Sequence, residues 1–141
     1  MAVRTADAEW RGNLAQGSGH MRLGSGAFEG SYDFRSRMGE GNGTNPEELL
    51  GAAHAGCFSM ALALELTNAG FTVKHIHTRA KVHFEERDGG WSIHRIDLDT
   101  EGSVSNVTAA AFEEFAQNAK KNCPVSRALS GVDIHLRAKL L

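Results

Sequence analysis

The chain has 141 residues, of which 23% are charged, and its formal net charge is only -2. This length suits a single domain with a hydrophobic core. The charge is balanced, and no basic cluster is interleaved with aromatic residues. The sequence therefore lacks the basic surface that is typical of nucleic-acid-binding proteins. Residues 1–12 lack the apolar core of a signal peptide, so we expect a cytoplasmic protein.

The N-terminal part of the sequence predicts short strands separated by glycine-rich turns. The candidate strands are residues 6–11, 20–23 and 31–37. This β arm, residues 1–37, has few large apolar side chains and cannot form a core alone. We therefore expect it to pack on another surface, that of a partner subunit, while residues 39–44 form a flexible connection to the next element.

A long helix over residues 45–69 is the element around which the rest of the chain is organised. Asn45 is suited to cap it, Pro46 fits the first turn, and Glu48 stands three residues after the cap, as in a capping box. Gly70 suits the left-handed residue that ends a helix. Apolar side chains lie all round this helix, which predicts burial on every side: Leu49, Leu50, Ala53, Phe58, Met60, Leu62, Leu64 and Leu66.

A membrane span is the alternative interpretation of this helix, because its apolar run is close to the length of about 20 residues that crosses a bilayer. The run contains His54 and Glu65, however, and it has no flanking basic or aromatic anchors. We therefore predict a core helix and no membrane association. Four small residues would let another backbone approach it closely: Gly51, Ala52, Ala55 and Gly56.

The pattern of apolar residues changes to a period of two after Gly70. Residues 75–85 alternate between apolar and polar side chains, which predicts a strand with one buried and one solvated face. Residues 88–90 predict a hairpin turn. In the return strand, apolar residues stand at odd-numbered positions before His94 and at even-numbered positions after Arg95. This change predicts a β-bulge.

Three further elements complete the predicted order βββ-α-ββ-α-α-β. Residues 108–121 form an amphipathic helix, residues 124–129 form a short helix, and residues 132–140 alternate as a last strand. This order places the chain in the α+β class, and we expect one domain over residues 1–141.

The two cysteines, Cys57 and Cys123, are the first candidates for chemistry. Cys57 lies in the middle of the long helix, where a single thiol is more often a small buried hydrophobe and gains nothing from a helix end. Cys123 precedes Pro124 as a predicted N-cap, where unpaired N–H groups and the helix dipole lower a thiol pKa. Local helix physics therefore favours Cys123 as the thiolate, and Cys57 would need a cation supplied from elsewhere.

The histidines offer weaker alternatives. His54 and Cys57 share a helix face, which suits a Cys/His hydrolase pair or half of a zinc site. No carboxylate is placed to orient His54, and the chain has no C-x-x-C or H-E-x-x-H motif, so we expect no metal and no other cofactor. His75, His77 and His83 lie on the solvated face of the predicted strand.

Two stretches of the sequence together resemble one known family. They are TNPEELLGAAHAGCFSMAL at residues 44–62 and NCPVS at residues 122–126. With Trp10 and the order of elements, they resemble the osmotically induced protein C (OsmC) family of hydroperoxide reductases, a sister group of the organic hydroperoxide resistance proteins (Ohr). The resemblance covers essentially the whole chain. It implies an OsmC-like fold, with two β-sheets wrapped around two central helices, and an intertwined homodimer with active sites between the subunits.

The resemblance also implies roles for four residues. Cys57 matches the peroxidatic thiol and Cys123 the resolving thiol. Arg37 matches the arginine that holds the thiolate, and Glu47 matches the glutamate that holds that arginine. The resemblance therefore favours Cys57 as the nucleophile, with Arg37 as the missing cation.

The activity implied is thiol-dependent reduction of organic hydroperoxides to alcohols in oxidative-stress defence. It would proceed through a Cys57 sulfenic acid and a Cys57–Cys123 disulfide, with an external dithiol, such as that of a lipoylated protein, as the reductant. Two other functions remain open: a non-catalytic stress or ligand-binding protein on the same fold, and the hydrolase that would use His54.

Helix geometry adds one expectation about the site. Glu47 and Cys57 are ten residues apart on one predicted helix, which corresponds to about 15 Å along its axis. A glutamate side chain spans only a fraction of that length. We therefore expect each active site to combine Cys57 of one chain with Glu47 of the partner.

Overall fold

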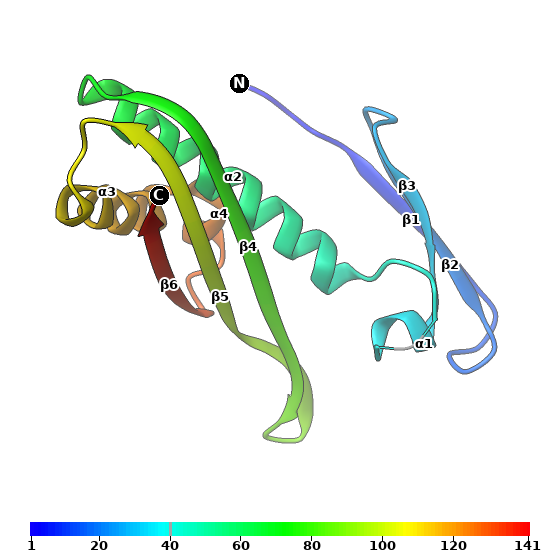
Figure 1. The fold of residues 1–141 in the computed structure, drawn as a ribbon. Coiled ribbons are helices and arrows are strands. Elements are labelled where there is room, and N and C mark those ends of the chain that lie inside the picture. The colour runs from blue at the N-terminus through cyan, green and yellow to red at the C-terminus, as the bar shows by residue number, and fades with distance from the viewer. Residues whose placement is uncertain (40) are drawn as a thin grey trace. The chain divides into compact units, whose positions relative to one another are not determined.

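The computed structural model describes residues 1–39 and 41–141; Glu40, part of the predicted connection 39–44, lies outside the described residues. The chain divides into two compact units, Met1–Leu49 and Leu50–Leu141. Figure 1 shows three short strands, two helices, a long hairpin, two more helices and a last strand along the chain. The predicted α+β class is confirmed, with one additional short helix.

The first unit contains an antiparallel sheet of three strands, in the order β1 (Ala6–Arg11), β2 (Ser18–Leu23) and β3 (Glu29–Tyr32). The first predicted strand is confirmed in full, and the second begins two residues earlier than predicted. On this sheet the ring centroids of Trp10 and Tyr32 are 5.6 Å apart. Among the described residues, every buried apolar side chain belongs to the second unit, so the arm has no core of its own, as predicted.

The third predicted strand, residues 31–37, is confirmed only at residues 31–32, and the strand there begins earlier, as β3 (Glu29–Tyr32). β3 stops before Asp33, and Phe34–Arg37 forms a short helix, α1. The reason is a capping box: Asp33 Oδ1 accepts a hydrogen bond from the Ser36 backbone at 2.7 Å, and Ser36 Oγ accepts one from the Asp33 backbone at 2.9 Å. Such local side-chain bonds offer the backbone an alternative to strand pairing.

The long predicted helix is confirmed as α2, Pro46–Asn68, which begins in the first unit and continues in the second. Asn45 caps it, because its Oδ1 accepts a hydrogen bond from the Glu48 backbone at 2.8 Å. The Glu48 carboxylate accepts a hydrogen bond from the Thr44 hydroxyl at 2.7 Å instead of closing the predicted box. At the other end Gly70 has a φ of 91°, and backbone bonds around it form the Schellman motif that ends the helix.

The prediction that α2 is buried on every side is wrong for the single chain, without a partner. Phe58, Leu62 and Leu66 form a fully buried face, but Met60 is 77% exposed and Leu64 is 61% exposed. Within the described residues, α2 is the one helix long and apolar enough to cross a membrane by length and composition, and 28% of its apolar segment is buried. Hydropathy shows that a helix face is apolar but not which molecule covers it.

The second unit contains a sheet in the order β4 (Thr72–Arg87), β5 (Gly90–Ser105) and β6 (Asp133–Leu140). β4 and β5 form the long antiparallel hairpin of Figure 1, and β6 pairs with β5 in parallel. The predicted turn is confirmed: Asp88 and Gly89 have φ values of 52° and 82°, and a type I′ turn requires positive φ at both positions.

The predicted β-bulge is confirmed at His94. His83 pairs with Arg95, and the next residue of β4, Phe84, pairs with Ile93, so His94 is the extra residue on β5. The bulge explains why apolar residues change parity along β5 while the same face of the sheet stays buried.

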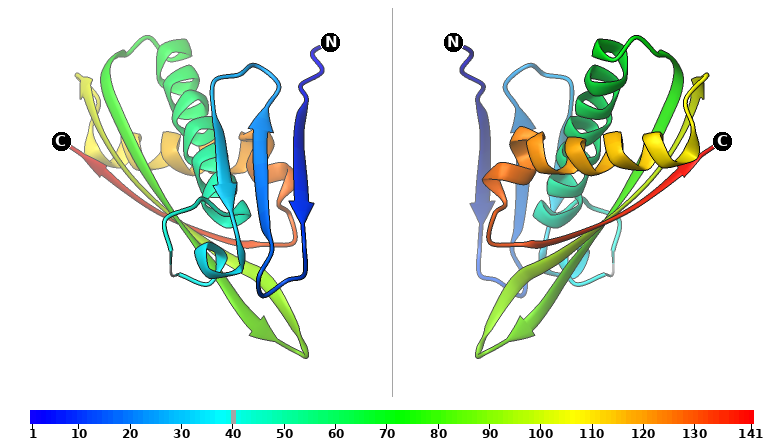
Figure 2. Two further views of the ribbon diagram at one scale, coloured as in Figure 1. Left: turned by 90° about the vertical axis from the view of Figure 1, so that its right-hand side faces the viewer. Right: turned by 90° about the vertical axis from the view of Figure 1, so that its left-hand side faces the viewer.

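The core of the second unit lies between the inner face of this sheet and the helices α2 and α3 (Ala109–Asn122). α3 is capped by Thr108, and α4 (Pro124–Ala128) follows it after one residue. Figure 2 shows α3 running across the direction of α2. Gly102 on β5 leaves room for the ring of Phe112, because a Cβ at Gly102 would lie 2.8 Å from that ring. The side chains that form the centre of this core are Phe58, Leu62, Leu66, Ile96, Leu98, Phe112, Ala116 and Ala119.

The outer face of the same sheet carries a regular pattern of charge. The central strand β5 presents three carboxylates, those of Asp97, Asp99 and Glu101. Basic or imidazole side chains lie directly opposite them on both neighbouring strands: Lys81, Arg79 and His77 on β4, and His135, Arg137 and Lys139 on β6. Opposite charges at facing positions of an antiparallel pair, here Lys81 with Asp97 and Arg79 with Asp99, stabilise a sheet by about 0.2–1 kcal/mol per pair.

Candidate active site

The first pair of candidate residues lies within the first unit, where α1 ends and α2 begins. Arg37 donates hydrogen bonds from Nε and Nη2 to one oxygen of Glu47, Oε1, at 2.9 and 2.7 Å. Asn45 connects the same two helix ends, since its Nδ2 donates to the Ser36 carbonyl at 3.2 Å. Glu47 is buried, whereas the Arg37 side chain is 44% exposed. A buried carboxylate thus holds the guanidinium group in one orientation and leaves part of it accessible.

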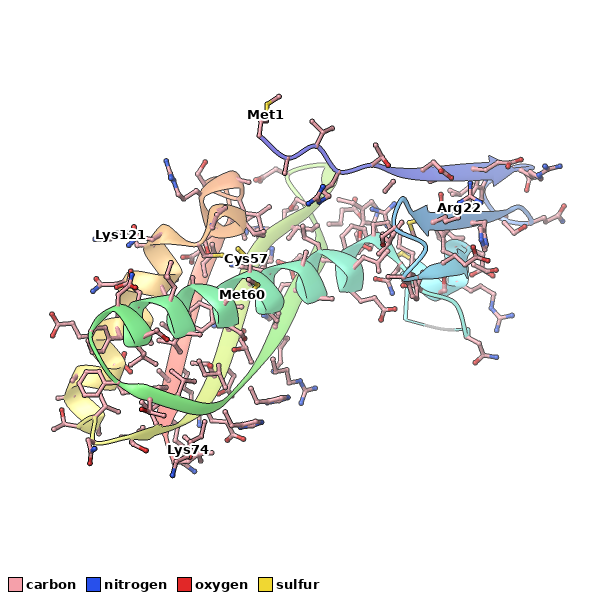
Figure 3. All side chains as sticks on the ribbon, turned by 90° about the horizontal axis from the view of Figure 1, so that it is seen from above. Met1, Arg22, Cys57, Met60, Lys74 and Lys121 are labelled. Atoms are coloured by element: carbon pink, nitrogen blue, oxygen red, sulfur yellow. The ribbon has the colours of Figure 1, made fainter. Side chains whose placement is uncertain are left out.

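The second pair lies within the second unit. Cys57 is on α2, as labelled in Figure 3, and Cys123 is the single residue between α3 and α4. Both thiols are free, and Cys123 donates a hydrogen bond to Cys57 across 2.9 Å between the sulfur atoms. Cys123 is fully buried and Cys57 is half-buried. A molecule that arrives from solvent therefore meets Cys57 first.

The surroundings of Cys57 within this unit disfavour its thiolate. Burial raises the pKa of the Cys57 thiol, and the hydrogen bond with Cys123 raises it further, whereas a backbone hydrogen bond from Val125 lowers it. The net shift of the pKa is upward. These surroundings therefore favour the protonated thiol, and the expectation that Cys57 needs a cation from elsewhere stays a prediction.

The first turn of α4 is hydrogen-bonded to Cys57. Cys123 occupies the N-cap position of α4, as predicted, but its side chain makes no capping hydrogen bond. The backbone of Val125, in the first turn of α4, is instead bonded to Cys57 on the facing helix. The signals of a single helix favour Cys123, because the contact from Val125 to Cys57 joins two helices and does not show in either helix alone.

A third pair, which the sequence did not connect, lies beside the two thiols. His54 Nε2 and Ser126 Oγ are 2.7 Å apart, and both side chains are buried. Burial lowers the pKa of His54, so its ring is neutral near pH 7. Among the described residues, His54 Nδ1 has no hydrogen-bond partner, so neither ring nitrogen is bonded to Cys57. The arrangement does not support a hydrolase in which His54 activates Cys57.

The matched spacing of this pair was the signal that could have identified it. His54 stands three residues before Cys57, and Ser126 stands three residues after Cys123. Residues three apart on a helix share a face. When Cys57 meets Cys123 on two packed helices, the equal spacing brings His54 next to Ser126 as well.

The remaining candidates are a metal site and the histidines of β4, in the part of the chain that the structure describes. There, no group of three or more His, Cys, Asp or Glu side chains is arranged to hold a metal ion. His75 and His77 are exposed on β4, as predicted. His83 differs, because it is half-buried and its Nε2 lies 2.8 Å from Asp97 Oδ2. Hydrogen bonds from His83 and Arg95 lower the pKa of the Asp97 carboxyl group.

Comparisons with known proteins identify relatives along nearly the whole chain. The profile of the family described as OsmC-like protein matches residues 39–137. The chain is 43% identical over 127 residues to peroxiredoxin OsmC of Escherichia coli (strain K12), covering 89% of each protein. It is 32% identical over 148 aligned positions to organic hydroperoxide resistance protein OhrB of Bacillus subtilis (strain 168), covering 99% of this chain and 100% of that protein.

A solved structure supports the same fold. An OsmC-like protein of unknown function from Vibrio cholerae O1 biovar eltor str. N16961 superposes with a TM-score of 0.79 at 14% sequence identity, covering 98% of this chain and 99% of that chain. The predicted OsmC-like fold is thus confirmed. Because a family profile and a 43% identical relative both extend over most of the sequence, the chain belongs to the OsmC family.

Proposed function

We propose that this protein is a thiol-dependent peroxidase that reduces organic hydroperoxides to alcohols in oxidative-stress defence. The observation that carries the proposal is the pair of free thiols, Cys57 and Cys123, with sulfur atoms 2.9 Å apart. Closure to a disulfide bond of about 2.05 Å needs little movement from this arrangement. The names of the similar proteins, peroxiredoxin OsmC and organic hydroperoxide resistance protein OhrB, support the same activity.

The two thiols take different roles because they differ in exposure. Cys57 is half-buried and is the attacking thiol, since the attacking sulfur must touch the peroxide. Cys123 is fully buried and is the resolving thiol, since it needs to reach only Cys57. Apolar residues one turn away on either side of Cys57, Ala53 and Met60, suit an organic peroxide better than hydrogen peroxide.

The reaction balances with these two residues and an external dithiol. The Cys57 thiolate attacks the distal oxygen of the hydroperoxide, so that an S–O bond forms, the O–O bond breaks, and the other oxygen leaves with a proton as an alcohol. Cys57 is then a sulfenic acid. Cys123 attacks its sulfur, an S–S bond forms, and the oxygen departs as water. Exchange with the external dithiol reduces the disulfide and oxidises that dithiol.

Arg37 supplies the cation that Cys57 lacks in this scheme. Its guanidinium group lowers the thiol pKa and stabilises the negative charge on the departing oxygen. Glu47 fixes the orientation of Arg37 through the two hydrogen bonds to Oε1. Because an arginine held in advance loses little freedom on reaction, this pair supports a preorganised site.

The assembly proposed is an intertwined homodimer with two composite sites. The exposed apolar face of α2, which consists of Ala53, Gly56, Met60 and Leu64, is the surface that a second copy would cover. Figure 3 shows Cys57 and Met60 along this helix, and the helical spacing places Cys57 at the border of the exposed face. A partner would then lie next to the reacting sulfur.

The distance along α2 supports the composite arrangement. Ten residues of helix separate Glu47 from Cys57, which corresponds to about 15 Å of axis. In the proposed dimer, Arg37 and Glu47 of one chain serve Cys57 of the other. The β arm, residues 1–37, packs on the partner, and residues 1–141 act as a single OsmC-like domain.

The reductant and compartment follow from the chemistry of the thiols. Each cycle consumes one external dithiol, and we assign this role to a dithiol of the lipoyl type. We place the chain in the cytoplasm, because a reducing compartment keeps Cys57 and Cys123 as thiols between cycles. No nucleic acid or membrane takes part.

Consumption of cumene hydroperoxide by the fully reduced protein, with dihydrolipoamide as reductant, tests the proposal. We expect the hydroperoxide to be converted to cumyl alcohol in equal amount to the dihydrolipoamide oxidised, and hydrogen peroxide to be consumed more slowly. A reduced protein with two titratable thiols that leaves cumene hydroperoxide intact would contradict the function. That result would favour a non-catalytic stress or ligand-binding protein on this fold.

A further inference from the structure

The contact between α2 and α4 has a second polar pair besides the two thiols. His54 Nε2 and Ser126 Oγ are 2.7 Å apart, and His54 is fully buried. No step of the proposed peroxidase cycle uses either side chain. A buried polar side chain must be hydrogen-bonded to avoid a large desolvation penalty, so each residue depends on the other.

The two contacts are arranged as two points along the same pair of helices. His54 lies about one turn before Cys57 on α2, and Ser126 lies about one turn after Cys123 on α4. The thiol contact and the bond from the Val125 backbone both reach α2 at Cys57, so alone they would let α4 pivot about that residue. A second contact one turn away removes that freedom, so the position of α4 fixes where the Cys123 sulfur points.

One feature indicates that His54 acts as a hydrogen-bond donor to Ser126. His54 Nδ1 is buried without a partner among the described residues. An unpaired ring N–H at that position would be costlier than an unpaired lone pair, which favours the tautomer with its proton on Nε2. Glutamine places an amide N–H near the position of histidine Nε2, so His54→Gln is a conservative variant and His54→Leu is a disruptive one.

We propose that His54 and Ser126 are positioning residues for the disulfide step, because they hold α4 so that Cys123 stays within reach of Cys57. This inference rests on the proposed function. In that step an S–S bond forms between Cys123 and the Cys57 sulfenic acid, the S–O bond breaks, and water leaves. The bridge therefore raises the effective concentration of the Cys123 thiol at the Cys57 sulfur.

The thiol–disulfide equilibrium with glutathione tests the positioning role without any peroxide. The reduced and disulfide forms of the whole protein are quantified by mass spectrometry after trapping free thiols. We expect Ser126→Ala and His54→Leu to lower the equilibrium constant for the Cys57–Cys123 disulfide about three- to tenfold. A tenfold change corresponds to about 30 mV in reduction potential. Ser126→Thr and His54→Gln should stay close to the wild type.

The double variant and a stability control separate positioning from general destabilisation. Because the two side chains act through one hydrogen bond, Ser126→Ala with His54→Leu should show little more effect than either change alone. Thr108→Ala removes the cap of α3 at a distance from the thiols. It should lower the melting temperature without moving the glutathione equilibrium.

A second readout connects the bridge to the peroxide reaction. In single-turnover experiments with cumene hydroperoxide, disulfide formation competes with over-oxidation of the Cys57 sulfenic acid to the sulfinic acid. We expect Ser126→Ala to raise the ratio of sulfinic acid to disulfide about three- to tenfold, and Ser126→Thr to restore it.

The outcomes distinguish this inference from the proposed function. If folded Ser126→Ala and His54→Leu proteins keep the wild-type glutathione equilibrium, the positioning role is overturned, whatever the peroxidase activity. If the equilibrium shifts as expected but the wild-type protein consumes no hydroperoxide, the bridge still positions the thiols and the peroxidase function is the part that fails.

Discussion

Arg37 directs two of its guanidinium nitrogens at a single oxygen of Glu47, at 2.9 and 2.7 Å, and both residues belong to the same unit of the same chain. The cation and the carboxylate that orients it therefore move together as one group. Any site that receives Arg37 receives it already aligned.

Replacement of Arg37 should reveal its effect on the reactive thiol. We expect Arg37→Gln to raise the pKa of Cys57 to or above the free-thiol value of about 8.5, because burial and Cys123 already disfavour the thiolate. The pH dependence of the Cys57 alkylation rate measures this. Arg35→Gln, on the same short helix, is the matched control and should leave the profile in place. An unshifted profile in Arg37→Gln would show that another group activates the thiol.

Replacement of each cysteine should separate the two roles. Cys57→Ser should abolish steady-state peroxidase activity, whereas Cys123→Ser should react once and then be over-oxidised or depend on an external monothiol, because its sulfenic acid has no internal partner. Intact-mass measurements after one equivalent of peroxide distinguish these states. Wild-type turnover by Cys57→Ser would refute the assignment of the attacking thiol.

Mixing of two inactive variants tests the composite site. Glu47→Ala and Cys57→Ser chains that exchange subunits should form heterodimers in which one site carries both defects and the other carries neither. Activity should then return to about half of that expected for a wild-type dimer at the same heterodimer concentration. Glu47→Ala mixed with Arg37→Gln is the matched control and should show no recovery, since both defects affect the same pair. Proven exchange without recovery in the first mixture would place the site within one chain.

A charge on the exposed face of α2 tests the proposed dimer. Leu64 is 61% exposed in the single chain, and we expect Leu64→Glu to convert the dimer to a monomer, because a buried unpaired carboxylate is strongly unfavourable. Light scattering after size-exclusion chromatography gives the mass. Asn118→Glu, on the exposed side of α3, is the control and should remain dimeric. A dimeric Leu64→Glu protein would mean that this face is not the subunit interface.

Local signals predicted much of the fold. The alternation of residues 75–85, the turn at Asp88 and Gly89 and the change of parity at His94 each depend on neighbours along one hairpin, and all three are confirmed. The helix ends at Asn45 and Gly70 were predictable for the same reason. By contrast, the strand predicted through Arg37 was wrong because a capping box at Asp33 competes with strand pairing.

The parts of the site that the sequence did not reveal all depend on contacts between helices. The hydrogen bond from Val125 to Cys57 and the pairing of His54 with Ser126 join residues more than sixty positions apart. A periodic pattern describes one element at a time, so it could not show that the first turn of α4 faces Cys57. For the same reason the exposed face of α2 could not be predicted from its hydropathy.

The buried histidine should make stability depend on pH. Burial lowers the pKa of His54, so the unfolded chain binds a proton below about pH 6.5 that the folded chain does not bind. We therefore expect the free energy of unfolding to decrease as the pH falls from about 6.5 towards the folded pKa of His54. Urea unfolding at a series of pH values measures this slope, and His54→Gln should reduce it. An equal slope in that variant would show that His54 does not titrate differently in the folded protein.

The charges on the outer face of the second sheet also bear on solubility. Both outer strands, β4 and β6, present basic or imidazole side chains at the positions that face the carboxylates of β5. If two such sheets met edge to edge, the lysine and arginine side chains of one edge strand would lie close to those of the other molecule. Unpaired strand edges otherwise invite further strands to add to them. The charges that stabilise the sheet within one molecule thus also oppose edge-to-edge aggregation of several molecules.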